Sequence, residues 1–138
     1  MLSEIQSAFV LRQPIGHLAS ADKKGRPHVV PVCFAYEDGR FVIAIDEKPK
    51  RTERLKRVRN IEENGQAALV FDHYDEDWRR LGWVMVQGAA TIVDDGEGHT
   101  RALAALRARY EQYGLMALEW RPVIVVTAER VSSWGELA

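Results

Sequence analysis

The residues best suited to chemistry form a basic segment between positions 48 and 59. The segment contains seven lysines or arginines and a single acid, Glu53. It therefore carries a charge of +6 in a chain whose net charge is −1, which leaves −7 for all other residues. Gathered ammonium and guanidinium groups bind phosphates and other anions through charge-assisted hydrogen bonds. A cluster of like charges also destabilises a fold unless something neutralises it, which favours an anion site here.

Two interpretations of the basic segment stay open on the residues alone. A helix over about 50–63 would place three of its cations, spaced by four and three residues, on one face. Its N-terminus would add unpaired N–H groups and a partial positive charge. The alternative is an ordinary solvated helix surface, which is what charge runs usually are. The candidate anion ligands are Lys48, Lys50, Arg51, Arg54 and Arg57.

Pro31 interrupts an apolar strand pattern that runs over 28–36. Proline cannot donate a ladder hydrogen bond, so this strand is expected at a sheet edge or to be locally irregular. A proline in such a place protects the edge from aggregation. Alternatively, it leaves the backbone groups of Val30 and Val32 free to face a ligand.

The remaining candidates do not form a catalytic site. Trp83 is the tryptophan that we expect beside a flat ring, although a core or interface position is the commoner role. His73 and the acids around it match no metal-ligand pattern, so no metal is expected. The single cysteine, Cys33, is most simply a small buried hydrophobic residue. No nucleophile–base arrangement stands out, and the catalytic residues stay unassigned.

The elements that must position these residues follow the order helix, three strands, helix, two strands, helix, strand. Short Asp/Gly turns between the first strands predict antiparallel hairpins. Asn64-Gly65 is expected to end the basic helix in a left-handed cap, and Gly88 to kink a long strand. The pattern favours a mainly β fold, a small antiparallel barrel with short flanking helices. The predicted helices span 3–13, 50–63 and 100–113, and the strands span 16–21, 28–36, 41–45, 66–71, 83–93 and 123–128.

Length and composition narrow the class of protein. A chain of 138 residues with 46% hydrophobic residues predicts one domain, 1–138, with a sizeable core. No apolar run is long enough for a membrane span, and the start lacks a signal-peptide pattern, so a cytoplasmic location is expected. The negative charge outside the basic segment argues against a nucleic-acid partner and favours a small anionic ligand.

Four segments together resemble the flavin-binding split-barrel superfamily that includes pyridoxamine 5′-phosphate oxidase. Within it, the chain looks like the deazaflavin-dependent (coenzyme F-420) enzymes, a subgroup seen largely in actinobacteria. The first two segments mark the superfamily and the last two the subgroup, and with the element order the likeness covers nearly the whole chain. The segments are 16–22, 25–34, 46–52 and 74–78.

The resemblance implies a six-stranded antiparallel split β-barrel that forms a homodimer with cofactor sites at the subunit interface. It implies that Pro31, Val32 and Cys33 lie along the cofactor ring and that the five candidate cations hold its phosphate. Flavin-using oxidases have a polar side chain where this chain has Trp83. That departure and the extra cations favour coenzyme F-420, which bears a phosphate and a polyglutamate tail, over FMN.

The implied activity is hydride transfer between the deazaflavin and an unsaturated small organic substrate. His73 and Tyr74 are candidate proton donors. The alternatives are an FMN-binding split-barrel oxidoreductase and a non-catalytic flavin- or deazaflavin-binding protein.

Overall fold

The computed structural model describes residues 1–46 and 55–138. Within these residues, eight strands form one antiparallel sheet with the order β2-β1-β5-β6-β7-β4-β3, and β8 pairs with β6. The strands are β1 (Gly16–Ala21), β2 (Pro27–Val32), β3 (Ala35–Glu37), β4 (Arg40–Ala44), β5 (Gln66–His73), β6 (Gly82–Val93), β7 (Val123–Thr127) and β8 (Arg130–Gly135). The helices are α1 (Glu4–Arg12), α2 (Lys56–Glu63) and α3 (Gly96–Arg109), with the 3-10 helices η1 (Trp78–Arg80) and η2 (Glu111–Leu115).

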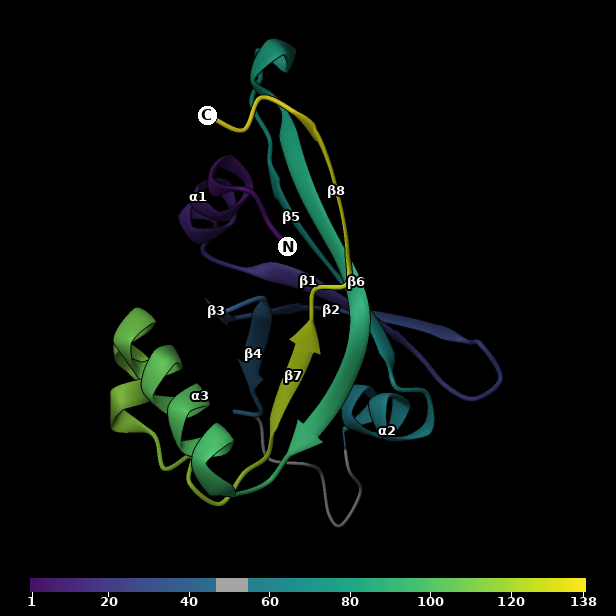
Figure 1. Ribbon diagram of the computed structural model, residues 1–138, viewed down its shortest axis with the longest axis vertical. Coiled ribbons are helices and arrows are strands. Elements are labelled where there is room, and N and C mark those ends of the chain that lie inside the picture. The colour runs from purple at the N-terminus through teal and green to yellow at the C-terminus, as the bar shows by residue number, and fades with distance from the viewer. Residues whose placement is uncertain (47–54) are drawn as a thin grey trace.

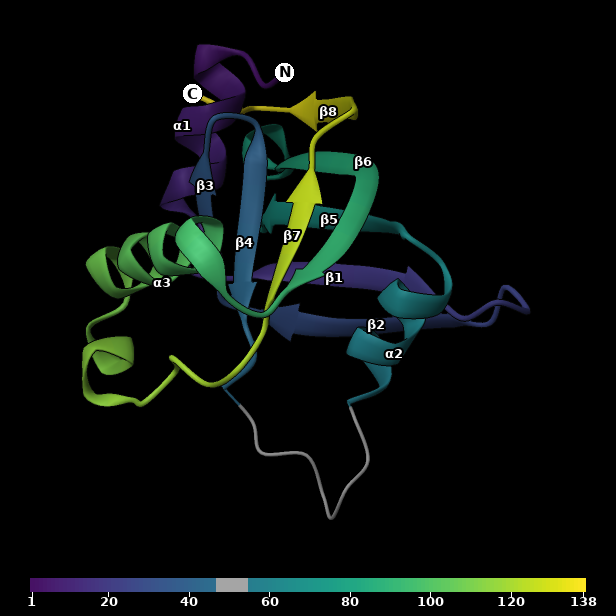
Figure 2. The same ribbon diagram turned by 60° about the horizontal axis from the view of Figure 1, so that its bottom comes forward.

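The long strand β6 joins two halves of the sheet that cross at a steep angle (Figures 1 and 2). Its first part pairs with β5 and β8, and its last four residues pair with β7. Gly88 lies at the change of partner, where a Cβ atom would overlap the backbone oxygen of Thr127. Only glycine allows that close approach, so the predicted kink at Gly88 has a steric cause.

The core lies between the two halves and is centred on four phenylalanines that are almost fully buried, Phe9, Phe34, Phe41 and Phe71. The ring centroids of Phe34 and Phe71 are 4.7 Å apart, and those of Phe41 and Phe71 are 5.2 Å apart. Burying each ring stabilises the fold by about 1.5–3 kcal/mol relative to leaving it exposed. A second apolar cluster, which includes Leu106, lies beneath α3.

The end of α3 ties together the junctions that precede β1 and follow β2. Arg109 donates to the carbonyls of Leu11 and Gln13, and its guanidinium lies 4.5 Å from the Phe34 ring centroid. Tyr110 accepts a hydrogen bond from the Phe34 N–H at 3.1 Å and donates to the Pro14 carbonyl at 2.9 Å. These contacts fix the backbone around Cys33, where the chain leaves β2.

The mainly β barrel fold is confirmed, but the strand count is eight over the described ranges rather than six. The predicted strand 28–36 is divided into β2 and β3, because the Phe34 N–H bonds to a tyrosine instead of a neighbouring strand. The strand β8 was missed, since its exposed polar residues lack an alternating pattern. The edge position predicted for the strand of Pro31 is confirmed.

Three helix predictions need correction. The helix α2 begins at Lys56, after an extended Leu55, and residues 50–54 of the predicted helix lie outside the described residues. It ends at Glu63 as expected, but Asn64 is extended instead of left-handed, with φ −138°. The helix predicted over 100–113 is α3 followed by η2, and it begins earlier, at Gly96. No helix in the described ranges is long and apolar enough to cross a bilayer.

Candidate functional site

A cavity of about 160 Å³ lies where the ends of β2 and β4 meet α2 and η2. Three of its walls come from positions 31–33, from the end of β4 and from the start of α2. We refer to it as the β2-end cavity. Its lining residues are Ile15, Pro31, Val32, Cys33, Ile43, Ala44, Asp46, Arg57 and Tyr113.

The cavity has both apolar and polar walls, because the strand ends contribute small and branched side chains while Asp46, Arg57 and Tyr113 contribute polar groups. Val32 and Ile43 are buried, whereas Pro31 is exposed on the outer face of β2. Ile15 precedes β1 and closes the side next to positions 31–33. An apolar cleft with a few convergent polar groups is the usual form of a small-molecule site.

Arg57 is the cation that α2 brings to the cavity, with only 8% of its surface exposed. The helix is fixed by Val58 and Ile61, which enter the core, and by Asn60, whose amide donates to Ser20 Oγ at 3.1 Å. A guanidinium held on a packed helix beside a cavity is suited to a phosphate or carboxylate.

Asp46 and Tyr113 form the opposite wall. Tyr113 donates its hydroxyl hydrogen to Asp46 Oδ2 at 2.9 Å, and Arg121 donates to the Asp46 carbonyl at 2.7 Å. Burial, and then the neighbouring Asp46 carboxylate, raises the pKa of the Tyr113 phenol. The phenol therefore stays protonated and engaged with Asp46 through the neutral range.

Another cation of the basic segment, Lys56, is directed away from this cavity. Its ammonium lies 3.5 Å from the carboxylate of Asp22, which is 3% exposed. Asp22 also pairs with Arg26 at 2.7 Å and accepts from two backbone N–H groups. These contacts with Arg26 hold the pKa of Asp22 well below its usual value. Lys56 thus has a structural role, linking α2 to the β1–β2 turn.

The structure brings together four of the nine predicted cofactor ligands, namely positions 31–33 and Arg57. Lys48, Lys50, Arg51 and Arg54 lie outside the described residues. Asp46, the last described residue before them, and Arg57, in the first turn of α2, both line the cavity.

Trp83 does not line the β2-end cavity of its own chain. The paired row Pro31, His17, Val70 and Met85 crosses β2, β1, β5 and β6. Trp83 lies on the same outer face, two residues along β6 from the end of that row. Three strand spacings of about 4.8 Å separate β2 from β6, so Trp83 is roughly 14 Å or more from Pro31.

The candidate proton donors His73 and Tyr74 are also remote from this cavity. They stand at the end of β5, on the connection to β6 that projects from the molecule opposite α2 (Figure 1). Tyr74 accepts a hydrogen bond from Trp78 Nε1 at 3.4 Å, and His73 Nε2 lies 3.8 Å from Asp75.

Sequence reasoning missed Asp46 and Tyr113, the polar pair of the cavity. Tyr113 is 80 residues from Cys33 along the chain and reaches the cavity only because η2 folds back beneath α3. No local pattern marks such a residue, although the position of Asp46 between a strand and the basic segment was a usable signal.

Comparisons with known proteins identify the family of this fold. The family model described as pyridoxamine 5′-phosphate oxidase matches residues 2–135. The chain belongs to that family. No curated protein matches this family member at a significant level.

Solved structures resemble this oxidase-family chain over nearly its full length. A conserved hypothetical protein from Mycobacterium tuberculosis is 23% identical, with 98% of this chain and 86% of that chain covered and a TM-score of 0.77. A FAD-binding protein from Mesorhizobium loti is 25% identical, with 96% and 94% covered and a TM-score of 0.69. A heme storage protein from Vibrio cholerae is 19% identical, with 94% and 90% covered and a TM-score of 0.74.

Proposed function

We propose that this chain is an oxidoreductase that binds a tricyclic, flavin-type cofactor at the β2-end cavity. In this proposal it transfers a hydride between the cofactor and an unsaturated small organic substrate. The observation that carries the proposal is the meeting of positions 31–33 with Arg57 in one cavity. The likeness to a FAD-binding protein supports a flavin-type ring.

The chemical types of the lining residues fit such a cofactor. The apolar walls from Val32, Ile43 and Ala44 suit a flat ring, and Arg57 suits its phosphate. However, a volume of about 160 Å³ is well below the roughly 300–1,000 Å³ of small-molecule sites. We infer that one chain supplies only part of the site.

A second copy of the chain is the group that we propose to complete it. The outer face of β2, β1, β5, β6 and β8 is largely apolar, with Val29 65% exposed and Trp134 55% exposed. Continuous apolar surface of this kind marks an interface. Pro31 belongs both to this face and to the cavity, so a second copy docked there would cover the cavity. In that arrangement Trp83 would approach the partner's site and not its own.

The charge pattern favours coenzyme F-420 over FMN. Seven cations within positions 48–59 exceed what a single phosphate needs. Lys56 is paired with Asp22 and is therefore not among the proposed ligands. A phosphate followed by several tail carboxylates would neutralise such a cluster, and we propose Lys48, Lys50, Arg51 and Arg54 as its ligands.

The hydride chemistry would belong to the bound cofactor, while the protein binds it, orients it and controls access. Positions 31–33 would hold one face of the ring, because Val32 and the Phe34 backbone are fixed by the core and by Tyr110. Tyr113 holds the Asp46 carboxylate in a hydrogen bond. This hydrogen bond would limit the repulsion between the Asp46 carboxylate and an anionic cofactor.

A non-catalytic binding protein is the second candidate. Tyr113 and Asp46 are two groups in the cavity wall that could exchange a proton, and they are hydrogen-bonded to each other. The raised pKa of Tyr113 makes its phenol a weak acid. Binding without turnover would agree with this pair having only a structural role.

Titration of tryptophan fluorescence with F-420, FMN and hemin separates these candidates. Micromolar F-420 is expected to saturate the signal, with weaker FMN binding and no stoichiometric hemin binding. Turnover is then assayed with reduced F-420 and a panel of enones and quinones. Saturation by FMN with no response to F-420 would overturn the deazaflavin assignment, and tight binding without any turnover would favour the second candidate.

A further inference from the structure

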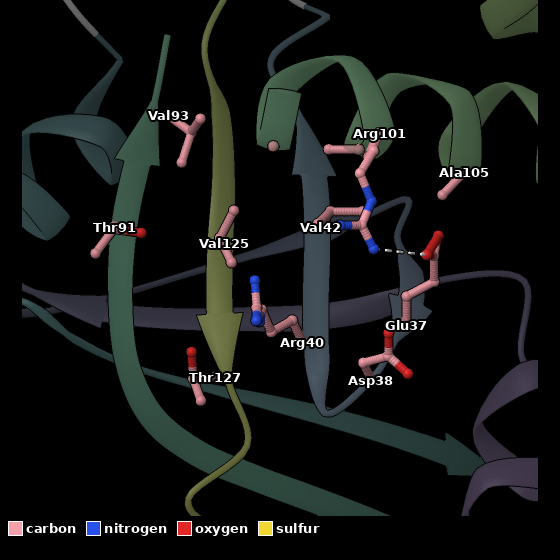
Figure 3. A pocket seen from close by; sticks show the side chains of 12 residues that line it. Glu37, Asp38, Arg40, Val42, Thr91, Val93, Arg101, Ala105, Val125 and Thr127 are labelled. Atoms are coloured by element: carbon pink, nitrogen blue, oxygen red, sulfur yellow. Dashed lines mark ion pairs between the residues drawn. The ribbon is translucent and has the colours of Figure 1, made fainter. Parts of the chain in front are cut away.

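A second and larger hollow lies between α3 and the outer face of β3, β4, β7 and the end of β6 (Figure 3). Its volume is about 500 Å³, within the roughly 300–1,000 Å³ typical of small-molecule sites. It shares no lining residue with the β2-end cavity. We refer to it as the α3 groove.

Strand register gives the α3 groove a polar end and an apolar floor. Alternate residues of a strand face the same side, so paired residues form rows across the sheet. One row is polar, and the next row on the same face is largely apolar. The polar row is Thr127, Arg40 and Glu37, and the next is Thr91, Val125 and Val42.

The helix wall leaves space above this floor because its residues there are small. Gly98, Ala102 and Ala105 are spaced by four and three residues and so share one face of α3. The large side chains of the helix, such as Leu103 and Leu106, enter the second core cluster instead. The groove is therefore formed within a single chain by folded, described elements.

Two arginines and two acids, Glu37 and Asp38, stand at the polar end. Figure 3 shows Arg101 extending from α3 toward Glu37, and the two side chains form an ion pair at 4.0 Å. Both are mostly exposed, so this pair is weak. Arg40 stands beside Val125 and Thr127 in the same view, and its guanidinium has no hydrogen bond or ion pair with any described residue.

We infer that the α3 groove binds a small organic carboxylate with a flat apolar body. The body would lie on Val42 and Val125 beneath the small residues of α3, and the carboxylate would take the guanidinium of Arg40. A guanidinium is the side chain that matches a carboxylate with two parallel hydrogen bonds. The hydroxyl of Thr127, next to Arg40 in the polar row, offers a further donor. This site is independent of the proposed cofactor site.

The test uses 2-naphthoate, with 2-naphthalenemethanol as its uncharged analogue, titrated into ¹⁵N-labelled protein. Naphthoate is expected to shift amide signals of β4, β7 and α3 in a saturable way. The Arg40→Gln variant should weaken naphthoate about tenfold or more, since it removes a charge-assisted contact, and leave the alcohol unchanged. Arg130→Gln, a change at an exposed arginine of β8, is the matched control and should alter neither affinity.

A second variant tests the place of the ligand independently of charge. Ala105→Trp fills the groove and should abolish binding of both naphthyl compounds. Unchanged affinity of Arg40→Gln for naphthoate would overturn the inference. So would naphthoate shifts confined to the β2-end cavity, or an aminomethyl analogue that binds more tightly than naphthoate.

Discussion

The β2-end cavity and the α3 groove are built in different ways. The cavity collects the ends of several elements, measures about 160 Å³ and borders the apolar face that Pro31 shares. The groove measures about 500 Å³ and is formed by aligned rows of one sheet beneath one helix. The β2-end cavity, made from the ends of several elements, is small, and in our proposal a second copy of the chain completes it. A site made on a sheet face is complete within one chain.

Reversing two charges of the basic segment should have the largest effect. The Lys50→Glu/Arg51→Glu variant is expected to lower F-420 affinity by more than about 100-fold, because charged contacts contribute about 1.5–3 kcal/mol each. Naphthoate binding in the α3 groove should not change. The measurement is fluorescence titration for the cofactor and NMR titration for naphthoate.

The matched control is Lys23→Glu/Lys24→Glu, which makes the same charge change at two exposed lysines of the β1–β2 turn. It should keep F-420 affinity within a factor of a few. Equal losses in both variants would mean that net charge, and not a local site, governs cofactor binding.

The second-largest effect should come from placing a charge on the apolar outer face, which should weaken binding in the β2-end cavity and leave binding in the α3 groove unchanged. Val29→Glu is expected to convert the proposed dimer to a monomer, since an unpaired carboxylate is costly to bury. F-420 affinity should fall with it, while naphthoate affinity stays unchanged. Sedimentation velocity gives the oligomeric state, with Ala104→Glu on the exposed side of α3 as control. A variant that stays dimeric, or a monomer with full F-420 affinity, would contradict an interfacial site.

Arg57→Gln should weaken F-420 binding about tenfold. This is the lower end of the range expected when one hydrogen bond to a charged group is lost. The control is Arg59→Gln, since Arg59 is exposed on the same helix and does not line the cavity. Isothermal titration calorimetry compares the two. An equal effect of both changes would show that Arg57 contributes only to the net positive charge of α2 and makes no specific contact with the cofactor.

The smallest effect concerns Asp22, which anchors α2 beside the cavity. Its pKa is held below the usual value of 3.8, mainly by Arg26, so its carboxylate stabilises the fold above about pH 4. That contribution is lost as the pH falls through the lowered pKa. Asp22→Asn should therefore have a lower urea midpoint than the parent at pH 7, and the gap should narrow at pH 3. A gap that is constant between the two pH values would mean that Asp22 acts through shape alone.

Most of the fold followed from local patterns in the sequence. The Ser3–Gln6 capping box, the short turns and the strand runs identify most of the elements because their causes lie within a few residues. The division of β2 from β3 was not predictable, since it depends on Tyr110, 76 residues away from Phe34. The strand β8 was missed because its exposed residues have no periodicity, and its pairing with β6 determines its conformation.

The candidate site was also predictable only in part, because only some of its residues are marked by local sequence features. Pro31 and the cations stand out as residue types, so positions 31–33 and Arg57 could be named before their meeting was known. Tyr113 was not, because only the return of η2 brings it to Asp46. The α3 groove also had no signal, since its polarity depends on which residues pair across strands.

A crystal structure of the protein with F-420 tests the central claim most directly. We predict the deazaflavin ring against Pro31, Val32 and Cys33, its phosphate on Arg57 and the cations of positions 48–54, and a second copy covering the site. Cofactor density in the α3 groove, or a ring bound away from positions 31–33, would contradict it.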